Sequence, residues 1–129
     1  MKSEEGSILI VDDEEPIRRL LASYLGTSYT CVTAKNAEEA KNLLAASSFN
    51  LVLTDITMPG ASGLELCEYI NMAHPDTLVV IVSAKVGELN FSGAKQCRAV
   101  DFIAKPFDLA QVLKTVKSAF RHQAKNTDG

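Results

Sequence analysis

Residues 7–21 read SILIVDDEEPIRRLL, and this stretch contains both repeating parts of the fold. It opens on an apolar run, Ile8 to Val11, of the kind found in parallel strands that are covered on both faces. Pro16 is favoured in the first turn of a helix, where its missing N–H costs nothing, and the acids before it suit the positive end of the helix dipole. The stretch therefore predicts a strand, a turn and a helix in direct succession.

The same alternation of short apolar runs and longer segments of helical period continues along the chain. The predicted strands are residues 7–11, 30–34, 51–54, 78–82 and 100–104. The second and fifth runs are mixed in polarity, which suits strands at the edges of a sheet. Strands that alternate with helices indicate an α/β domain with a parallel sheet and right-handed crossovers.

The helices between these strands are predicted from their apolar stripes and caps. Asn36 and Asp108 are expected to cap helices, and one helix should end before Pro75. A helix within 86–97 is expected to be short, irregular or mobile, because glycine and other weak helix formers interrupt it. In the first helix, residues with helical spacing are expected to face the sheet; they are Ile17, Leu20, Leu21 and Leu25.

The composition is that of one ordinary soluble domain. The 129 residues are 47% hydrophobic and 22% charged, with a formal net charge of −3. That charge argues against direct binding of nucleic acid, which needs a basic surface. No apolar run approaches the roughly 18 residues that span a bilayer, and the polar start is no signal peptide, so we expect a cytoplasmic protein without membrane contact.

Domain boundaries and cysteine usage follow from the same pattern. We expect a disordered N-terminus at 1–6, one domain at 7–121, and a C-terminal tail or linker stump at 122–129. Cys31, Cys67 and Cys97 are widely spaced and lack a CxxC motif, so all are expected to be small buried hydrophobes rather than metal or redox ligands.

Polar residues stand where the predicted apolar strands end. Asp12 and Asp13 follow the first strand, Asp55 the third, Ser83 the fourth and Lys105 the fifth. In an open parallel sheet the carboxyl ends of the strands form the binding site, so these side chains should converge on one rim.

The convergence predicts magnesium-assisted phosphoryl transfer. Three neighbouring carboxylates repel one another, and Mg²⁺ is a hard cation that few carboxylates can hold beside a phosphate. The Lys105 ammonium and the Ser83 hydroxyl can each bind a phosphoryl oxygen. Asp55 is then the predicted nucleophile, which forms an acyl phosphate.

From about Ile8 to Phe120 the sequence resembles the receiver domain of two-component response regulators. The motifs that carry the resemblance are IVDDE at 10–14, LTDITMPG at 53–60, SGLE at 62–65, SA at 83–84 and DFIAKPF at 101–107. The resemblance implies a CheY-like, flavodoxin-like doubly wound (βα)5 fold, with a five-stranded parallel sheet in the order 2-1-3-4-5.

The resemblance also implies a site and a mechanism. Mg²⁺ would be held by Asp13 and Asp55 directly, by Asp12 through water and by the backbone carbonyl of Thr57. A sensor histidine kinase or a phosphotransfer protein would donate the phosphoryl group to Asp55, and the domain would catalyse only its own phosphorylation and dephosphorylation. It would not be a turnover enzyme on external substrates.

Signal output is likewise implied by the resemblance. Ser83 and Phe102 would couple phosphorylation to the surface of the fourth helix, fifth strand and fifth helix. An output domain or a downstream protein would read that surface, and a homodimer that forms on phosphorylation is a further implication. The family usually has glycine where this chain has Arg98, so Arg98 must either adopt a costly left-handed conformation or end its helix differently.

Three other functions were weighed. A phosphatase with an aspartate nucleophile needs an acid two residues after it, where this chain has Thr57. A flavodoxin-like nucleotide-binding protein needs a glycine-rich phosphate loop, and acids stand in its place. A pseudo-receiver, which keeps the fold as an interaction module without phosphorylation, is disfavoured by the intact Asp55, Ser83 and Lys105.

Overall fold

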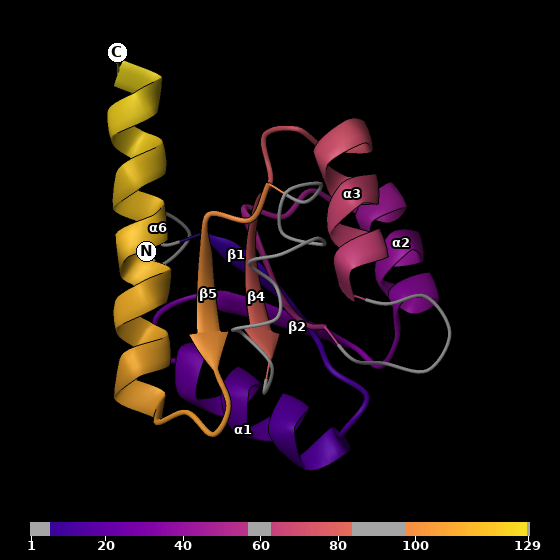
Figure 1. Ribbon diagram of the computed structural model, residues 1–129, viewed down its shortest axis with the longest axis vertical. Helices are drawn as coiled ribbons and strands as arrows, with labels where there is room; N and C mark the ends of the chain where they lie inside the picture. The colour runs from indigo at the N-terminus through magenta and orange to yellow at the C-terminus, as the bar shows by residue number, and fades with distance from the viewer. Residues whose placement is uncertain (1–5, 57–62, 84–97, 129) are drawn as a thin grey trace.

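A computed structural model describes residues 6–56, 63–83 and 98–128 of the chain, with side chains up to Arg121. Figure 1 shows the arrangement of its helices and strands. The strands are β1 (Ser7–Val11), β2 (Thr30–Ala34), β3 (Leu51–Asp55), β4 (Leu78–Ser83) and β5 (Asp101–Ala104). The helices are α1 (Glu15–Leu25), α2 (Ala37–Ala46), α3 (Gly63–Ala73) and α6 (Leu109–Asp128). The helix predicted within 86–97 lies outside the described residues.

The strands form one parallel sheet in the order β2-β1-β3-β4-β5, which confirms the predicted topology. The strands of mixed polarity, β2 and β5, stand at the edges. In the central strand β3 every residue is buried. Its burial on both faces explains why the run 51–54 is apolar throughout except for Thr54.

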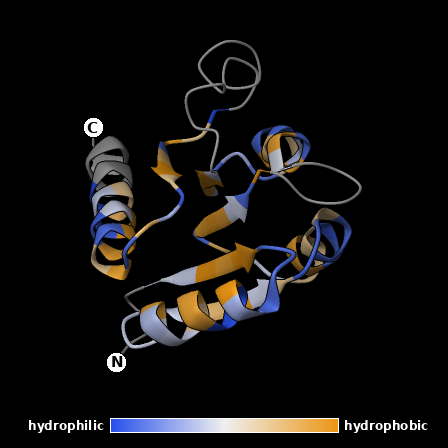
Figure 2. Cartoon of the chain, turned by 60° about the horizontal axis from the view of Figure 1, so that its bottom comes forward, coloured by the Kyte–Doolittle hydropathy of each residue, from blue (hydrophilic) through white to orange (hydrophobic). Residues whose placement is uncertain are grey.

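Helices cover both faces of the sheet. α1 and α6 pack on one face, over a core that includes Ile10, Leu53 and Val116. α2 and α3 pack on the other, over a core that includes Leu9, Val52 and Ile70. In Figure 2 the central strands are largely coloured as hydrophobic, whereas the surrounding helices carry both hydrophilic and hydrophobic residues. Because the strands are parallel, their carboxyl ends lie together at one edge of the sheet.

Both predicted helix caps are present. The side chain of Asn36 accepts a hydrogen bond of 2.8 Å from the backbone N–H of Glu39 at the start of α2. Asp108 does the same for Gln111 at 2.7 Å, before α6. These bonds satisfy N–H groups that have no partner within the helix.

One prediction for α1 is wrong. Leu21 and Leu25 are buried, but Leu20 has an exposed fraction of 46%. Leu20 lies at the border of the apolar stripe, beside a groove lined by Ile17, Lys105 and Phe107. Helical spacing predicted which residues share one face of α1, but it did not show that Leu20 lies outside the part of that face that packs on the sheet.

The last helix is longer than its apolar stripe. The stripe ends near Phe120, whereas the helical backbone continues to Asp128. Gln, Ala and Lys, which follow at 123–125, have high helix propensity, which favours continuation of the helix. The helix therefore continues without a break across the predicted boundary between a domain at 7–121 and a tail or linker at 122–129. This boundary stays a prediction.

The cysteines differ from one another. Cys31 is half-buried and free, and burial raises its pKa to about 11, so it is an unreactive thiol. Cys67 is fully buried in the core as predicted, and it is disulfide-bonded, which the sequence analysis did not predict. Cys97 lies outside the described residues.

Arg98 does not adopt the left-handed conformation, because no described residue other than glycine has a positive φ. Its backbone N–H instead donates a 2.8 Å hydrogen bond to the side chain of Asn71 on α3. The left-handed alternative for this position is thereby excluded, whereas the end of the preceding helix lies outside the described residues.

Among the described residues, none of the helices combines the length and the hydrophobicity that crossing a bilayer requires.

Candidate phosphoryl-acceptor and metal site

The parallel strands finish at one end of the sheet (Figure 1), and the predicted acidic, hydroxyl and lysine residues lie at these strand ends. Asp12 follows β1, Asp55 is the last residue of β3, Ser83 is the last of β4, and Lys105 follows β5. The topology places β1, β3 and β4 side by side, so residues far apart in sequence become neighbours. The prediction that these strand ends converge is confirmed.

Three carboxylates form the centre of the site. Oxygen atoms of Asp12, Asp13 and Asp55 all lie within 4.8 Å of one another. Asp12 and Asp55 are buried, with exposed fractions of 2% and 7%, whereas Asp13 is exposed. Two of the three charges are thus largely removed from water, and the third borders the solvent.

Lys105 is the cation that compensates this cluster. Its Nζ lies 3.3 Å from Oδ2 of Asp12 and 3.4 Å from Oδ2 of Asp55. Burial alone would lower the pKa of Lys105, but attraction to Asp12 and Asp55 and the hydrogen bonds to them outweigh burial, so the pKa lies above its ordinary value. Lys105 therefore stays charged and bridges two of the acids.

Residues that the sequence analysis did not predict fix the loop after β1. Nη1 of Arg18 on α1 donates a 2.8 Å hydrogen bond to the backbone carbonyl of Asp12. Oδ1 of Asp12 accepts a 2.9 Å bond from the backbone N–H of Glu14. These contacts orient the acidic pair. An arginine one turn inside an amphipathic helix has no sequence signal that separates this role from solvation.

The end of β4 holds the predicted hydroxyl residue. Ser83 has an exposed fraction of 1%, and its backbone carbonyl accepts a 3.0 Å hydrogen bond from the N–H of Lys105. This bond ties the residue that carries the hydroxyl to the residue that carries the ammonium. The peptide bond between Lys105 and Pro106 is cis.

The aromatic residue of the predicted switch, Phe102, is half-buried and packs against the core on the α2 and α3 face of the sheet. Thr57, the remaining predicted metal ligand, lies outside the described residues.

This donor set fits a hard divalent cation. Mg²⁺ prefers oxygen ligands and is bound in proteins by one or two carboxylates together with water and phosphate. Asp12, Asp13 and Asp55 supply carboxylate oxygens close enough to share one ion. Among the described residues the cluster contains carboxylates and no cysteine, whereas soft metals select thiolates.

The family model described as "Response regulator receiver domain" matches residues 8–117. The chain belongs to the response regulator receiver domain family. It is a receiver domain of the two-component response regulator type, as the sequence motifs indicated.

Curated relatives of this receiver domain are several times its length. It is 43% identical to the response regulator protein PilR of Pseudomonas aeruginosa over 88% of the chain. It is 35% identical to the DNA-binding transcriptional regulator NtrC of Escherichia coli over 92% of the chain. The chain spans 26% of the length of each of these relatives.

Solved structures show the same fold. TrrA of Thermotoga maritima, in complex with Mg²⁺ and BeF, is 33% identical with a TM-score of 0.79, over 87% of this chain and 96% of that one. A CheY-like receiver domain protein of Methanospirillum hungatei is 28% identical with a TM-score of 0.87, over 93% and 97% of the two chains. NtrX of Brucella abortus is 31% identical with a TM-score of 0.87. The match covers 95% of this receiver domain and 28% of NtrX.

The carboxylate cluster predicts opposite effects of Asp13→Asn with and without metal. In a metal chelator the variant should melt about 2–5 °C higher than the wild type, because one repelling charge is removed. With Mg²⁺ at about 100 times its Kd, the wild type should gain roughly 2.7 kcal/mol of stability, and the variant markedly less. Thermal melts in EDTA and in Mg²⁺ measure both effects. Glu38→Gln on α2 is the control for loss of an exposed acid, and equal Mg²⁺ responses in all three proteins would contradict the assignment.

The ion pairs of Lys105 predict a specific loss of stability at alkaline pH. Because the folded-state pKa of Lys105 is raised above 10.5, its contribution is fully present below that value and is lost as the pH rises through the folded-state pKa. Lys105→Gln should lack this contribution, so the difference in melting temperature between the wild type and this variant should shrink as the pH rises. Melts of the metal-free proteins across the alkaline range measure this, with the exposed Lys114→Gln as control. A constant difference between wild type and Lys105→Gln at every pH would contradict the prediction.

Proposed function

We propose that this receiver domain accepts a phosphoryl group on Asp55 in an Mg²⁺-dependent reaction. The observation that carries the proposal is the carboxylate of Asp55, which is buried, lies in a cluster of three acids and is paired with Lys105 at 3.4 Å. A nucleophile, a cation site and a fixed ammonium are thereby gathered at one strand end. Phosphoryl transfer depends mainly on such positioning and electrostatic stabilisation.

In the proposed reaction a carboxylate oxygen of Asp55 attacks the phosphorus of a phosphohistidine. The P–O bond to Asp55 forms as the P–N bond breaks, and the electron pair of that bond returns to the histidine nitrogen of the donor. Lys105 and the hydroxyl of Ser83 bind phosphoryl oxygens. Mg²⁺ bound by Asp13, Asp55, Asp12 through water and the carbonyl of Thr57 would neutralise the remaining charge.

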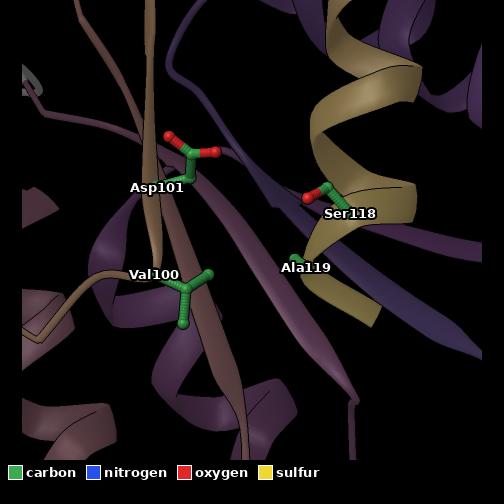
Figure 3. Close-up of a pocket in the computed structure, with 4 residues that line it drawn as sticks. All are labelled: Val100, Asp101, Ser118 and Ala119. Atoms are coloured by element: carbon green, nitrogen blue, oxygen red, sulfur yellow. The ribbon is translucent and has the colours of Figure 1, made fainter. Parts of the chain in front are cut away.

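We infer that the switch residues are Ser83 and Phe102, and that the output surface includes β5 and α6. Ser83 is adjacent in the sheet to Ala104, and Phe102 stands two residues earlier on that strand. On this surface a cavity of about 230 Å³ lies between α6 and the start of β5 (Figure 3), lined by Val100, Asp101, Ser118 and Ala119. A surface of this kind can be read by an output domain, a separate protein or a second receiver.

Receiver domains are regulatory, and the only catalysis proposed for this one is its own phosphorylation and dephosphorylation. PilR and NtrC are regulators, and NtrC is named as DNA-binding, which suggests a DNA-binding output for a longer protein of this type. The receiver itself, with its net charge of −3, is not proposed to bind DNA. A cytoplasmic location remains part of the proposal.

The phosphohistidine donor is proposed to dock beside Lys105. An apolar groove of about 420 Å³ is lined by Ile17 and Leu20 of α1 and by Lys105, Pro106 and Phe107. Lys105 belongs both to this groove and to the acidic site, so a helix seated in the groove would bring its histidine toward Asp55. The groove also gives the unexpectedly exposed Leu20 a function.

The central test is intact-protein mass spectrometry after incubation with acetyl phosphate and Mg²⁺. One phosphoryl group should be added to the wild type and none to Asp55→Ala or to a sample in EDTA, because both the nucleophile and the cation are required. Asp76→Ala, on the opposite end of the sheet, is the matched aspartate control. A wild type that gains no phosphoryl group and does not respond to beryllofluoride would instead be a pseudo-receiver.

The docking groove predicts that donors of different size respond differently to Leu20→Ala. Transfer from the histidine domain of a sensor kinase that phosphorylates the wild type should slow by about threefold to tenfold. Phosphorylation by acetyl phosphate should be unchanged, since this small donor needs no groove. Met72→Ala removes a more exposed apolar side chain, 85% exposed on α3, and serves as the control. Equal slowing with both donors would assign Leu20 a structural role only.

A further inference from the structure

The backbone carbonyl of Asp55 is held closely from one side by Thr54. Thr54 is fully buried, and its hydroxyl donates a 3.0 Å hydrogen bond to this carbonyl. Thr54 lies in a strand of which every residue is buried. Its hydroxyl contacts the main chain of the proposed phosphoryl acceptor rather than the site itself.

Gly63, the first residue of α3, approaches the same carbonyl from elsewhere in the chain. An ideal Cβ on Gly63 would lie 2.1 Å from the carbonyl oxygen of Asp55 and 2.8 Å from Cα of Ile56. Carbon atoms do not approach backbone atoms this closely, so any side chain at 63 would force the main chain at 55–56 to move. Gly63 is therefore needed for space and not for a left-handed backbone.

Two further hydrogen bonds complete this arrangement. The N–H of Gly63 donates to the carbonyl of Ile56 at 3.0 Å, and the N–H of Ile56 donates to the carbonyl of Val82 at 3.2 Å. The residue after β3 is thus bonded both to the start of α3 and to β4.

We propose that Thr54 and Gly63 are positioning residues for the phosphoryl-transfer site. They fix the main chain of Asp55 and Ile56, and through it the Asp55 carboxylate relative to Asp12 and Asp13. This inference rests on the function proposed above. A displacement of about 1 Å at a reacting group can cost roughly a hundredfold in rate, so modest shifts of this backbone are enough to matter.

The test compares four variants of the whole chain. Thr54→Val keeps the shape of the side chain and removes the hydroxyl, and Thr54→Ser restores the hydroxyl. Gly63→Ala introduces the clash with Asp55. Gly26→Ala is the matched control, because its Cβ would also meet backbone, at 2.5 Å from the carbonyl oxygen of Ala22, but at the far end of α1.

Three quantities are measured for each protein: the Kd for Mg²⁺ alone by NMR titration, the initial rate of phosphorylation by acetyl phosphate at saturating Mg²⁺, and the melting temperature in EDTA. Gly63→Ala should weaken Mg²⁺ binding and slow phosphorylation by about tenfold or more. Thr54→Val should weaken Mg²⁺ binding and slow phosphorylation by about threefold to tenfold, and Thr54→Ser should recover most of the loss. Gly26→Ala should lower the melting temperature and leave the Mg²⁺ affinity unchanged.

The two proposals fail in different ways. If the wild type takes up no phosphoryl group, the proposed function is wrong, and the Mg²⁺ titrations still decide the positioning role. If the wild type is phosphorylated and Thr54→Val matches it in Mg²⁺ affinity and rate, the positioning role is wrong. That comparison holds even if Gly63→Ala fails to fold, since Thr54→Val preserves the packing of the strand.

Discussion

Repulsion among Asp12, Asp13 and Asp55 is the constraint around which this structure is arranged. Two unit charges about 4 Å apart interact by roughly 4 kcal/mol at an effective dielectric near 20. Oxygen atoms of the three acids lie within 4.8 Å of one another, and two of the acids are buried. The fold must therefore hold in place a cluster that would lower its own energy by spreading apart, and Lys105 offsets only part of the repulsion.

The sheet supplies the rigidity that this cluster needs. β3, which carries Asp55, is buried along its whole length between β1 and β4, so it cannot shift without disturbing two neighbouring strands and the cores on both faces. Asp12 is fixed by Arg18 from α1, and the main chain of Asp55 is enclosed by Thr54 and Gly63. Apolar packing thus stabilises a charged site that could not form by itself.

Some features of the fold and of the site could be predicted from the sequence, and others could not. Strand limits, the caps Asn36 and Asp108, and the convergence of the site residues followed from short patterns, because periodicity and parallel topology determine them. The exposure of Leu20, the bond from Arg18 and the disulfide of Cys67 could not be predicted. Leu20 borders a groove formed with residues 105–107, which are distant in sequence, and an arginine on a helix surface gives no sequence signal that separates a bond to the backbone from solvation.

The backbone conformation of Arg98 also could not be predicted from the sequence. A family pattern with glycine at that position suggested a choice between strain and a different helix end, and the sequence could not decide between them. The deciding contact is the side chain of Asn71, 27 residues away, which accepts the Arg98 N–H. Arg98 therefore combines a long-range hydrogen bond with a backbone that is not left-handed.

The cluster of charges also suggests how the segment from Phe102 to Lys105 could both respond to phosphorylation and pass the response to the output surface. A phosphoryl group adds about two negative charges to a site that already has three carboxylates, so the pairing of Lys105 must change on phosphorylation if the proposed function is right. Lys105 stands three residues after Phe102, and its N–H is bonded to the carbonyl of Ser83. A shift of the ammonium toward a new partner would therefore act on the residue that carries the hydroxyl and on the strand that carries the aromatic ring. The electrostatic strain of the resting site and the coupling to the output surface would then have the same origin.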